Sequence, residues 1–316
     1  MAGSERIGKS SAGLALIVAT GVLWGTIGIA AKLIYQRSNL DPVAITWLRA
    51  LIATPVCIGM AWRSFGRKTF SASKRDLTAM ILLGFILIAY QFSYLVGVDH
   101  LGVSTATLIA LCVPPVLVAL VSVLFFNEKL SVRFAAALAG ALLGLLLLVG
   151  TGSHTAVSGS MTIGVLGALG CSLGIASHAL LSRNLAGRQP AMRPLAIAFP
   201  VGAVAFAPIA LWRGVHYDIP LSAWLLLLYL GIGPSALAYV MFQRGLKDVP
   251  ATTASIVTLL EPLVAAILAW AMFDERLGVW GWVGAALLIA AIATLSLSVR
   301  AGEAAAPAEL AVEPSI

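Results

Sequence analysis

The sequence predicts an all-α membrane protein, with ten transmembrane helices arranged as two inverted five-helix repeats. Three observations predict it: an apolar composition, ten long apolar runs and an internal repeat. Of the 316 residues, 60% are hydrophobic and only 10% are charged, whereas soluble domains carry about 25% charged residues. The mean hydropathy is +0.99. So few charged side chains cannot cover a water-soluble fold of this size, which excludes that class.

The ten apolar runs are long enough to cross a bilayer, whose hydrocarbon core needs about 20 apolar residues per helix. None has the two-residue alternation of a barrel strand. The first run is too long for the apolar part of a signal peptide, so we expect it to be retained. In order, the expected helices cover residues 12–35, 43–62, 77–98, 105–126, 134–150, 164–185, 195–212, 221–242, 253–273 and 279–299.

The charged residues between these runs orient the chain. Fifteen Lys and Arg residues fall on one side of the predicted membrane and four on the other, with Arg49 inside the second run. The positive-inside rule therefore predicts that both termini are cytoplasmic. Residues 301–316 contain too little apolar surface to order themselves, and we expect a disordered cytoplasmic tail.

The same distribution argues against several partners. The net charge of +7 is spread over short loops, so no nucleic acid is expected. The three cysteines, Cys57, Cys112 and Cys171, lie inside apolar runs and are typical of packing residues. We therefore expect no disulfide, no metal and no cofactor. The expected partners are the lipid bilayer and a small-molecule substrate.

An internal repeat divides the chain. Residues 103–132 align without a gap on residues 250–279, an offset of 147 that places Pro115 on Pro262. A weaker match places Gly21 on Gly170 at an offset of 149. We therefore expect one repeat over residues 1–150 and a second over 151–300. Five is odd, so the second repeat enters the membrane in the opposite direction. Inverted repeats surround a site near the bilayer midplane and permit alternating access.

Several short motifs accompany the ten-helix plan. They are Leu23-Trp24-Gly25, Trp47-Leu48-Arg49, Tyr239 followed by Arg244-Gly245-Leu246, Glu261-Pro262 and Glu275-Arg276-Leu277. With these motifs the chain resembles the EamA-type transporters of the drug/metabolite transporter superfamily, over nearly all of its length before the tail. The resemblance is greatest to bacterial exporters of aromatic and other neutral amino acids, and with the Ala-rich composition it implies a bacterial inner membrane.

Prolines are predicted to interrupt five of the helices. Each removes a backbone hydrogen bond, which either produces a packing kink or supplies a hinge. The repeat-matched pair Pro115 and Pro262 points to the central cavity, because paired interruptions in inverted repeats mark the binding site. The prolines are Pro55, Pro114, Pro115, Pro200, Pro208, Pro234 and Pro262.

Two ionisable side chains lie deep in the apolar runs. A charged Glu261 there must face the interior. It could neutralise the buried Arg49, bind the ammonium group of a zwitterion or carry a coupling proton. The resemblance makes Glu-Pro a feature of the whole family, which favours the pairing with Arg49. His178 is either a hydrogen-bonded packing residue or a cavity group that titrates near neutral pH.

Aromatic and hydroxyl side chains predict the substrate class. Tyr90 and Tyr94 lie one turn apart, and Ser235 and Tyr239 repeat that spacing. Tyr and Trp residues near helix ends fit an interfacial belt instead. A mixed aromatic and polar lining suits small amphipathic solutes. The predicted substrate-binding residues are Trp24, Tyr90, Gln91, Tyr94, Cys112, His178, Ser235, Tyr239, Ser255, Thr258 and Glu261.

The sequence thus favours a secondary transporter that exports amino acids or similar metabolites. A carrier of drugs, other cations, sugar phosphates or nucleotide sugars is the alternative within the superfamily. A receptor or scaffold is less favoured because the loops are short. No motif of an intramembrane protease and no Walker loop occurs, so we expect no enzyme. Proton coupling, the direction of transport and the oligomeric state stay open.

Overall fold

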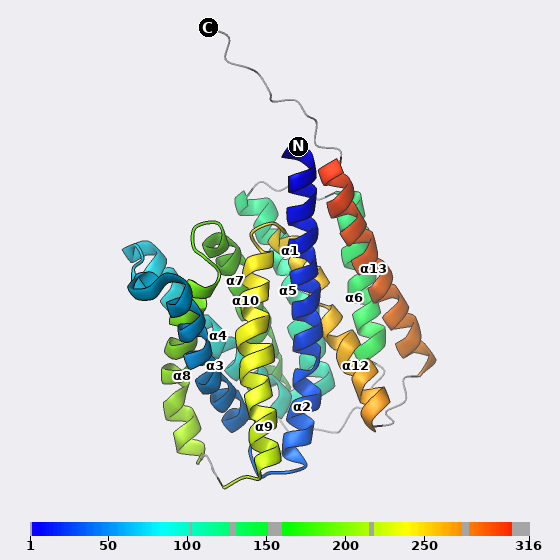
Figure 1. Cartoon of the computed structure of the whole chain (residues 1–316). Coiled ribbons are helices and arrows are strands. Elements are labelled where there is room, and N and C mark those ends of the chain that lie inside the picture. Colours follow the sequence, from blue (N-terminus) through cyan, green and yellow to red (C-terminus); the bar gives the residue numbers. More distant parts are fainter. Residues whose placement is uncertain are drawn as a thin grey trace.

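The computed structural model describes residues 2–101, 103–126, 131–150, 160–214, 218–273 and 278–304. Within these ranges all regular structure is helical (Figure 1). The start of α1 and the end of α13 lie at the same end of the bundle, which we call the terminal face. The ends of α2 and α8 and the starts of α3 and α9 lie at the opposite face. An all-α fold is therefore confirmed.

The helices follow the apolar runs in order. In the first half they are α1 (Ala2–Gly25), α2 (Ile27–Tyr35), α3 (Pro42–Phe65), α4 (Lys74–Leu101), α5 (Val103–Phe126) and α6 (Val132–Gly150), with a 3₁₀ turn, η1 (Gly66–Phe70), after α3. In the second half they are α7 (Met161–Ala186), α8 (Met192–Arg213), α9 (Leu221–Leu230), the π-helical η2 (Gly231–Leu237), α10 (Ala238–Gly245), α11 (Ala251–Val257), α12 (Leu260–Phe273) and α13 (Val279–Ala304).

Local sequence explains where the helices begin and end. At the start of α3 the Asp41 carboxylate accepts a hydrogen bond from the Ala44 amide at 2.7 Å, and Pro42 occupies the first turn. Gly66 ends the same helix with a φ of 55°, which favours glycine. The α3 boundaries thus lie just outside the predicted 43–62.

Ten membrane crossings are confirmed. Nine described helical runs have the length and composition of a transmembrane span, and a shorter apolar stretch, Val279–Leu295, lies in α13. The observed bounds extend most predicted runs by a few residues. The larger differences are at the two ends, since α1 begins at Ala2 and α13 continues to Ala304. The rest of the predicted tail lies outside the described residues, as do the loop motifs at residues 127–130 and 274–277.

Three of the ten spans are broken. The first divides at Thr26 between α1 and α2, the eighth passes through the π-helical η2, and the ninth divides at Thr258 and Leu259. Pro234 lies within η2. Pro262 lies in the first turn of α12, where a backbone N–H has no partner within the helix, so the proline is accommodated there.

The other prolines do not interrupt their helices. Each removes only one N–H from an otherwise complete ladder, and a helix can absorb that loss by a local bend. Pro115 therefore differs from its counterpart Pro262, which follows a break. Continuous helices contain Pro55, Pro114, Pro115, Pro200 and Pro208.

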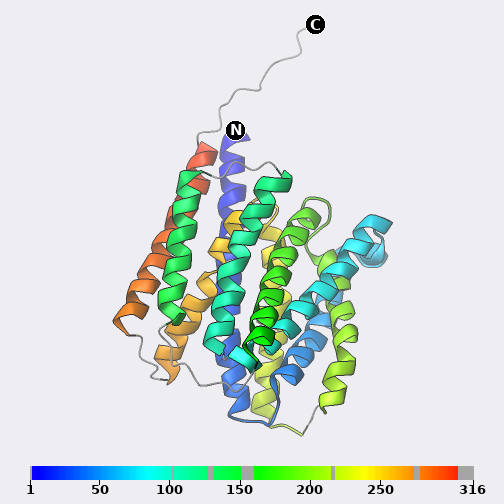
Figure 2. The same ribbon diagram turned by 180° about the vertical axis from the view of Figure 1, so that it is seen from behind.

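The helices pair in a pattern that the two repeats share. The packing of α4 on α7 corresponds to that of α1 on α10, since the third span meets the sixth and the eighth meets the first. Two further pairs, α3 with α8 and α6 with α13, join equivalent spans of the two halves. Figure 2 shows α6 and α13 along one side of the bundle. Every one of these contacts crosses between the halves, so neither half packs on itself alone.

Candidate functional site

Six ring side chains from five helices meet inside the bundle, and we call them the aromatic cluster. The hydroxyl groups of Tyr90 and Tyr239 lie 2.5 Å apart. The Trp24 ring centroid lies 5.1 Å from that of Tyr239, and His178 stacks on Phe242 at 5.8 Å. Such distances are typical of favourable aromatic pairs. The cluster comprises Trp24, Tyr90, His178, Phe199, Tyr239 and Phe242.

The backbone positions Trp24 in this cluster. Its indole Nε1 donates to the carbonyl oxygen of Pro234 in η2, at 3.1 Å. One residue later, a Cβ added to Gly25 would lie 2.7 Å from the carbonyl oxygen of Glu261, so only glycine permits this approach of α1 to α12. The indole also contacts two of the three hydrophobic cores. Trp24 therefore links α1, η2 and both cores.

Three polar side chains lie next to the aromatic cluster. We call them the polar layer, and they are Arg49, Gln91 and Glu261. Arg49 donates a hydrogen bond to the side-chain oxygen of Gln91, whose amide donates to the carbonyl of Leu87 at 3.1 Å. The carbonyl oxygen of Glu261 lies against Gly25, the residue after Trp24, so Glu261 borders the same cluster. Among the described residues, no direct ion pair joins Arg49 to Glu261. Glu261 is partly exposed rather than sealed in the core.

The remaining predicted site residues lie at different distances from this centre. The Tyr94 hydroxyl lies 2.8 Å from that of Thr107, which joins α4 to α5. The hydroxyl of Ser255 donates to the carbonyl of Thr252, and that of Thr258 donates to the carbonyl of Ser255, so both hydrogen-bond to their own chain at the α11–α12 break.

Three other predicted residues serve packing in this structure. Ser235 is buried within η2. Cys112 packs against one hydrophobic core. His178 is buried among the other rings of the aromatic cluster, and the Ser182 hydroxyl lies 3.5 Å from its Nε2. It therefore belongs to the aromatic cluster and not to the polar layer.

Sequence reasoning missed four residues. Phe199 and Phe242 belong to the aromatic cluster, and Phe242 could have been found because it lies one turn after Tyr239. Thr107 is the partner of Tyr94. Cys171, interpreted as a packing residue, lies near Glu261. Within the described chain, no three His, Cys, Asp or Glu side chains could hold a metal ion together.

The two ends of the bundle differ in how far matched residues are buried. At the terminal face all of α11 is buried. The repeat alignment places Thr107 of α5 on Ala254 of α11, and Ile109 on Ile256. Ala254 and Ile256 have no exposed surface, whereas Thr107 and Ile109 are partly exposed. The matched residues are therefore more deeply buried at the terminal face than at the opposite face.

Comparison with known proteins follows the same division. The model of the EamA-like transporter family matches residues 11–150 and again residues 162–297. The transporter YwfM of Bacillus subtilis is 26% identical, over 91% of this chain and 94% of its own length. The inner membrane transporter YicL of Salmonella typhimurium is 23% identical, over 93% and 98%.

Relatives extend beyond bacteria, and one solved structure has the same fold. A transporter of Archaeoglobus fulgidus is 27% identical, over 89% of this chain and 94% of its own length. A crystal structure with 21% identity superposes with a TM-score of 0.79, covering 93% of this chain and 99% of that one. Since the family model matches both halves, this multi-pass membrane protein belongs to the EamA-like transporter family.

Proposed function

We propose that this transporter exports aromatic and other neutral amino acids, or similar small amphipathic metabolites, by alternating access. One observation carries the proposal: the basic Arg49 and the acidic Glu261 lie beside the aromatic cluster without a direct ion pair between them. A site of this composition matches a solute with two opposite charges and an apolar side chain.

Each part of an amino acid finds a suitable group in the site. The Arg49 guanidinium carries five N–H donors, of which the bond to Gln91 uses one, and the others suit a carboxylate. The Glu261 carboxylate accepts hydrogen bonds from an ammonium group. Rings of Trp24 and Tyr239 offer an apolar surface to the side chain.

Alternating access follows from the inverted repeats. The loop charges favour an orientation with the terminal face in the cytoplasm. The Ala-rich composition and the family favour a bacterial inner membrane. In that orientation, the burial of α11 supports a state that is closed to the cytoplasm. If the two halves exchanged their packing, the site would open to the cytoplasm instead.

The direct test is transport by the purified protein in liposomes, with radiolabelled phenylalanine and leucine as amino-acid probes. We expect uptake of both above protein-free liposomes, and we expect an unlabelled amino acid to compete. Each flux is compared with and without a pH gradient, which also reports proton coupling. Failure of every amino acid, with transport of a sugar phosphate or a nucleotide sugar, would refute the assignment.

An organic cation is the second candidate that the site favours. Glu261 supplies one negative charge, and the face of Trp24 could stabilise a cation. The two candidates differ at Arg49, which binds the carboxylate of an amino acid but repels a cation. Replacing Arg49 by glutamine should abolish amino-acid transport, whereas it should preserve or increase transport of a cation such as ethidium.

A further inference from the structure

A groove of about 490 Å³ opens between α4 and α7, on the side of the terminal face. Its lining residues belong to neither the aromatic cluster nor the polar layer. One face of α4 and one face of α7 form its walls, and Leu82 in the lining is 49% exposed, so the groove is open to the surroundings of the bundle. Its principal lining residues are Arg75, Leu82 and Ile86 on α4, and Leu181, Asn184 and Arg188 on α7.

The groove exists because the two helices diverge. Far from the terminal face they are in close contact, where a Cβ added to Gly167 would lie 2.8 Å from the Gly97 amide nitrogen. Nearer the middle, a Cβ added to Gly174 would overlap that of Tyr90. Beyond this point α4 and α7 separate towards the terminal face, as Figure 2 shows. Glycines thus fix the closed end of the groove.

The lining changes from polar to apolar along the groove. Arg75 and Arg188 lie at the terminal end, and Leu82 and Ile86 lie deeper. The distance from Arg75 to Ile86 along α4 is about 16 Å at 1.5 Å per residue. This is close to half of a hydrocarbon core of about 30 Å. The groove therefore extends from the membrane surface to about the midplane, the depth of one leaflet.

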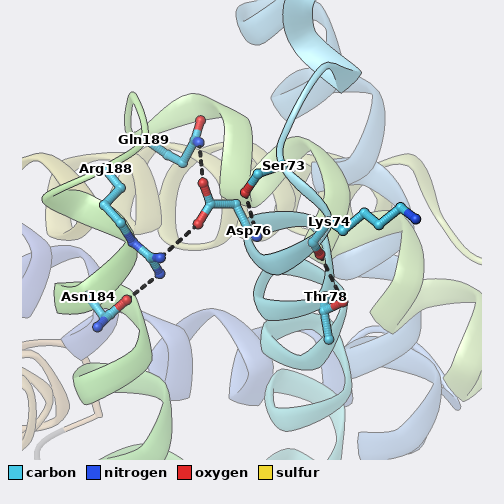
Figure 3. A network of polar contacts seen from close by, with 7 residues as sticks. All are labelled: Ser73, Lys74, Asp76, Thr78, Asn184, Arg188 and Gln189. Atoms are coloured by element: carbon cyan, nitrogen blue, oxygen red, sulfur yellow. Dashed lines mark hydrogen bonds and ion pairs between the residues drawn. The ribbon is translucent and has the colours of Figure 1, made fainter.

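A polar network fixes the charges at the mouth (Figure 3). The Asp76 carboxylate lies 3.1 Å from an Arg188 nitrogen and accepts a hydrogen bond from the Gln189 amide at 2.8 Å. Arg188 also donates to Asn184 on its own helix. The Arg188 side chain remains 33% exposed, and Arg75 is exposed beside it. Two guanidinium groups against one carboxylate leave the mouth with a net positive charge.

We propose that this groove binds an anionic phospholipid from the leaflet at the terminal face. Arg75 and Arg188 would bind the headgroup phosphate, and one acyl chain would lie along Leu82 and Ile86. Basic pockets between transmembrane helices attract anionic headgroups. The cavity is in the size range of small-molecule sites. Because the apolar part of the groove opens into the hydrocarbon of one leaflet, its natural occupant is a lipid chain.

Native mass spectrometry of the full-length protein tests the proposal. The protein is titrated in detergent with dioleoylphosphatidylglycerol, and separately with dioleoylphosphatidylcholine, which has the same chains without the net charge. We expect preferential binding of the anionic lipid. Each lost arginine should weaken that binding about fivefold. Equal binding of the two lipids by the natural protein would overturn the proposal.

Three variants make the result specific. Arg75→Gln leaves the Arg188–Asp76 ion pair intact, so it tests the headgroup without loss of that contact. Leu82→Trp should reduce binding of the anionic lipid by filling the groove while both arginines remain. Arg213→Gln is the matched control, because Arg213 is exposed at the opposite face. Unchanged lipid preference in both groove variants, or the same loss in the control, would contradict the site.

A further experiment distinguishes a bound lipid from a bound soluble anion. Excess inorganic phosphate is added to the protein with bound dioleoylphosphatidylglycerol. We expect the lipid to remain bound, because its chain contacts Leu82 and Ile86. Complete displacement by phosphate would assign the two arginines to a soluble anion and overturn the lipid proposal.

Discussion

Tyr90 and Tyr239 are separated by 149 residues, the same offset that relates Gly21 to Gly170 in the repeat alignment. They are therefore equivalent positions of the two halves. A residue that contacts its own counterpart must lie close to the symmetry axis that relates the halves. The hydroxyl contact thus marks the place where the axis crosses the aromatic cluster. Inverted repeats move about such an axis, so this contact can persist while the two ends open in turn.

Removing one hydroxyl of this pair should lower the folding stability by more than half of the loss that removing both hydroxyls causes. Either Tyr90→Phe or Tyr239→Phe leaves a buried hydroxyl without its partner, at about 1–3 kcal/mol of folding free energy. The double variant leaves two apolar rings in contact. We expect its loss of stability to be smaller than the sum of the single losses, as measured by thermal unfolding in detergent. Strict additivity would argue that the two hydroxyls do not interact.

Glu261 should contribute more to transport than to folding. The Glu261→Gln variant keeps the size of the side chain but removes the charge that would bind an ammonium group. Hydrogen bonds to charged groups contribute about 1.5–3 kcal/mol, so we expect at least about tenfold slower amino-acid transport in liposomes. The melting temperature should change little.

Asp218→Asn provides the matched control, since Asp218 is an exposed carboxylate outside the spans. Normal transport in Glu261→Gln would remove this residue from the mechanism. A large fall in melting temperature with normal residual activity would assign it a structural role instead.

At the scale of helices, glycines set how closely neighbouring elements approach. Gly174 of α7 packs against Tyr90 of α4, and Gly144 of α6 packs against Gly284 of α13. In a membrane, where lipid is as apolar as the helix surface, such close contacts replace the hydrophobic driving force. Three Gly-x-x-x-Gly motifs, Gly21 to Gly25, Gly140 to Gly144 and Gly170 to Gly174, therefore contribute to packing within one bundle.

The Gly174→Ala variant should be destabilised. Its new methyl group would overlap the Cβ of Tyr90, so α4 and α7 must separate or the tyrosine must move. Overpacking of this kind costs about 1–3 kcal/mol. Gly28→Ala is the control, because nothing lies within 4 Å of a Cβ at that position. We expect a lower melting temperature for the first variant and an unchanged or higher one for the second. The reverse order would contradict the described packing.

The sequence predicts the ten spans well because lipid demands long apolar helices with internally satisfied backbones. It predicts the helix breaks poorly. Proline is the usual sequence signal for a break, yet α5 continues through Pro114 and Pro115. The first span instead breaks at Thr26, which has no proline near it in the sequence. There the threonine hydroxyl bonds the carbonyl of Leu23 at 2.7 Å and the backbone makes a 3₁₀-type contact. Whether such a side chain competes for backbone hydrogen bonds depends on the neighbouring helices. A single sequence does not reveal how those helices pack.

Only part of the candidate site could be predicted from the sequence, for similar reasons. Tyr90 and Tyr239 could be found because helical spacing places them on interior faces. The partner of Arg49 could not be found in this way. Its side chain bonds Gln91 rather than Glu261 because of how α3 packs against α4. Likewise, spacing alone does not place His178 among rings instead of beside the polar layer.

For the whole molecule, the two halves share a packing plan but differ in exposure. Thr107 and Ile109 of α5 are partly exposed, yet the matched Ala254 and Ile256 of α11 have no exposed surface. A perfectly symmetric arrangement would expose both alike. The difference therefore belongs to the conformation, and exchanging it between the halves would produce a state that is open at the terminal face.

This exchange predicts unequal cysteine labelling at one matched pair. In a variant with Cys57, Cys112 and Cys171 replaced by serine or alanine, Thr107→Cys and Ala254→Cys are labelled separately with a maleimide that reaches both faces of unsealed membranes. Minor conformers are typically populated at about 0.1–10%, so Thr107→Cys should react at least about tenfold faster than Ala254→Cys. A transported amino acid should change the ratio by favouring other states of the cycle. Equal rates that do not respond to substrate would contradict alternating access about this pair.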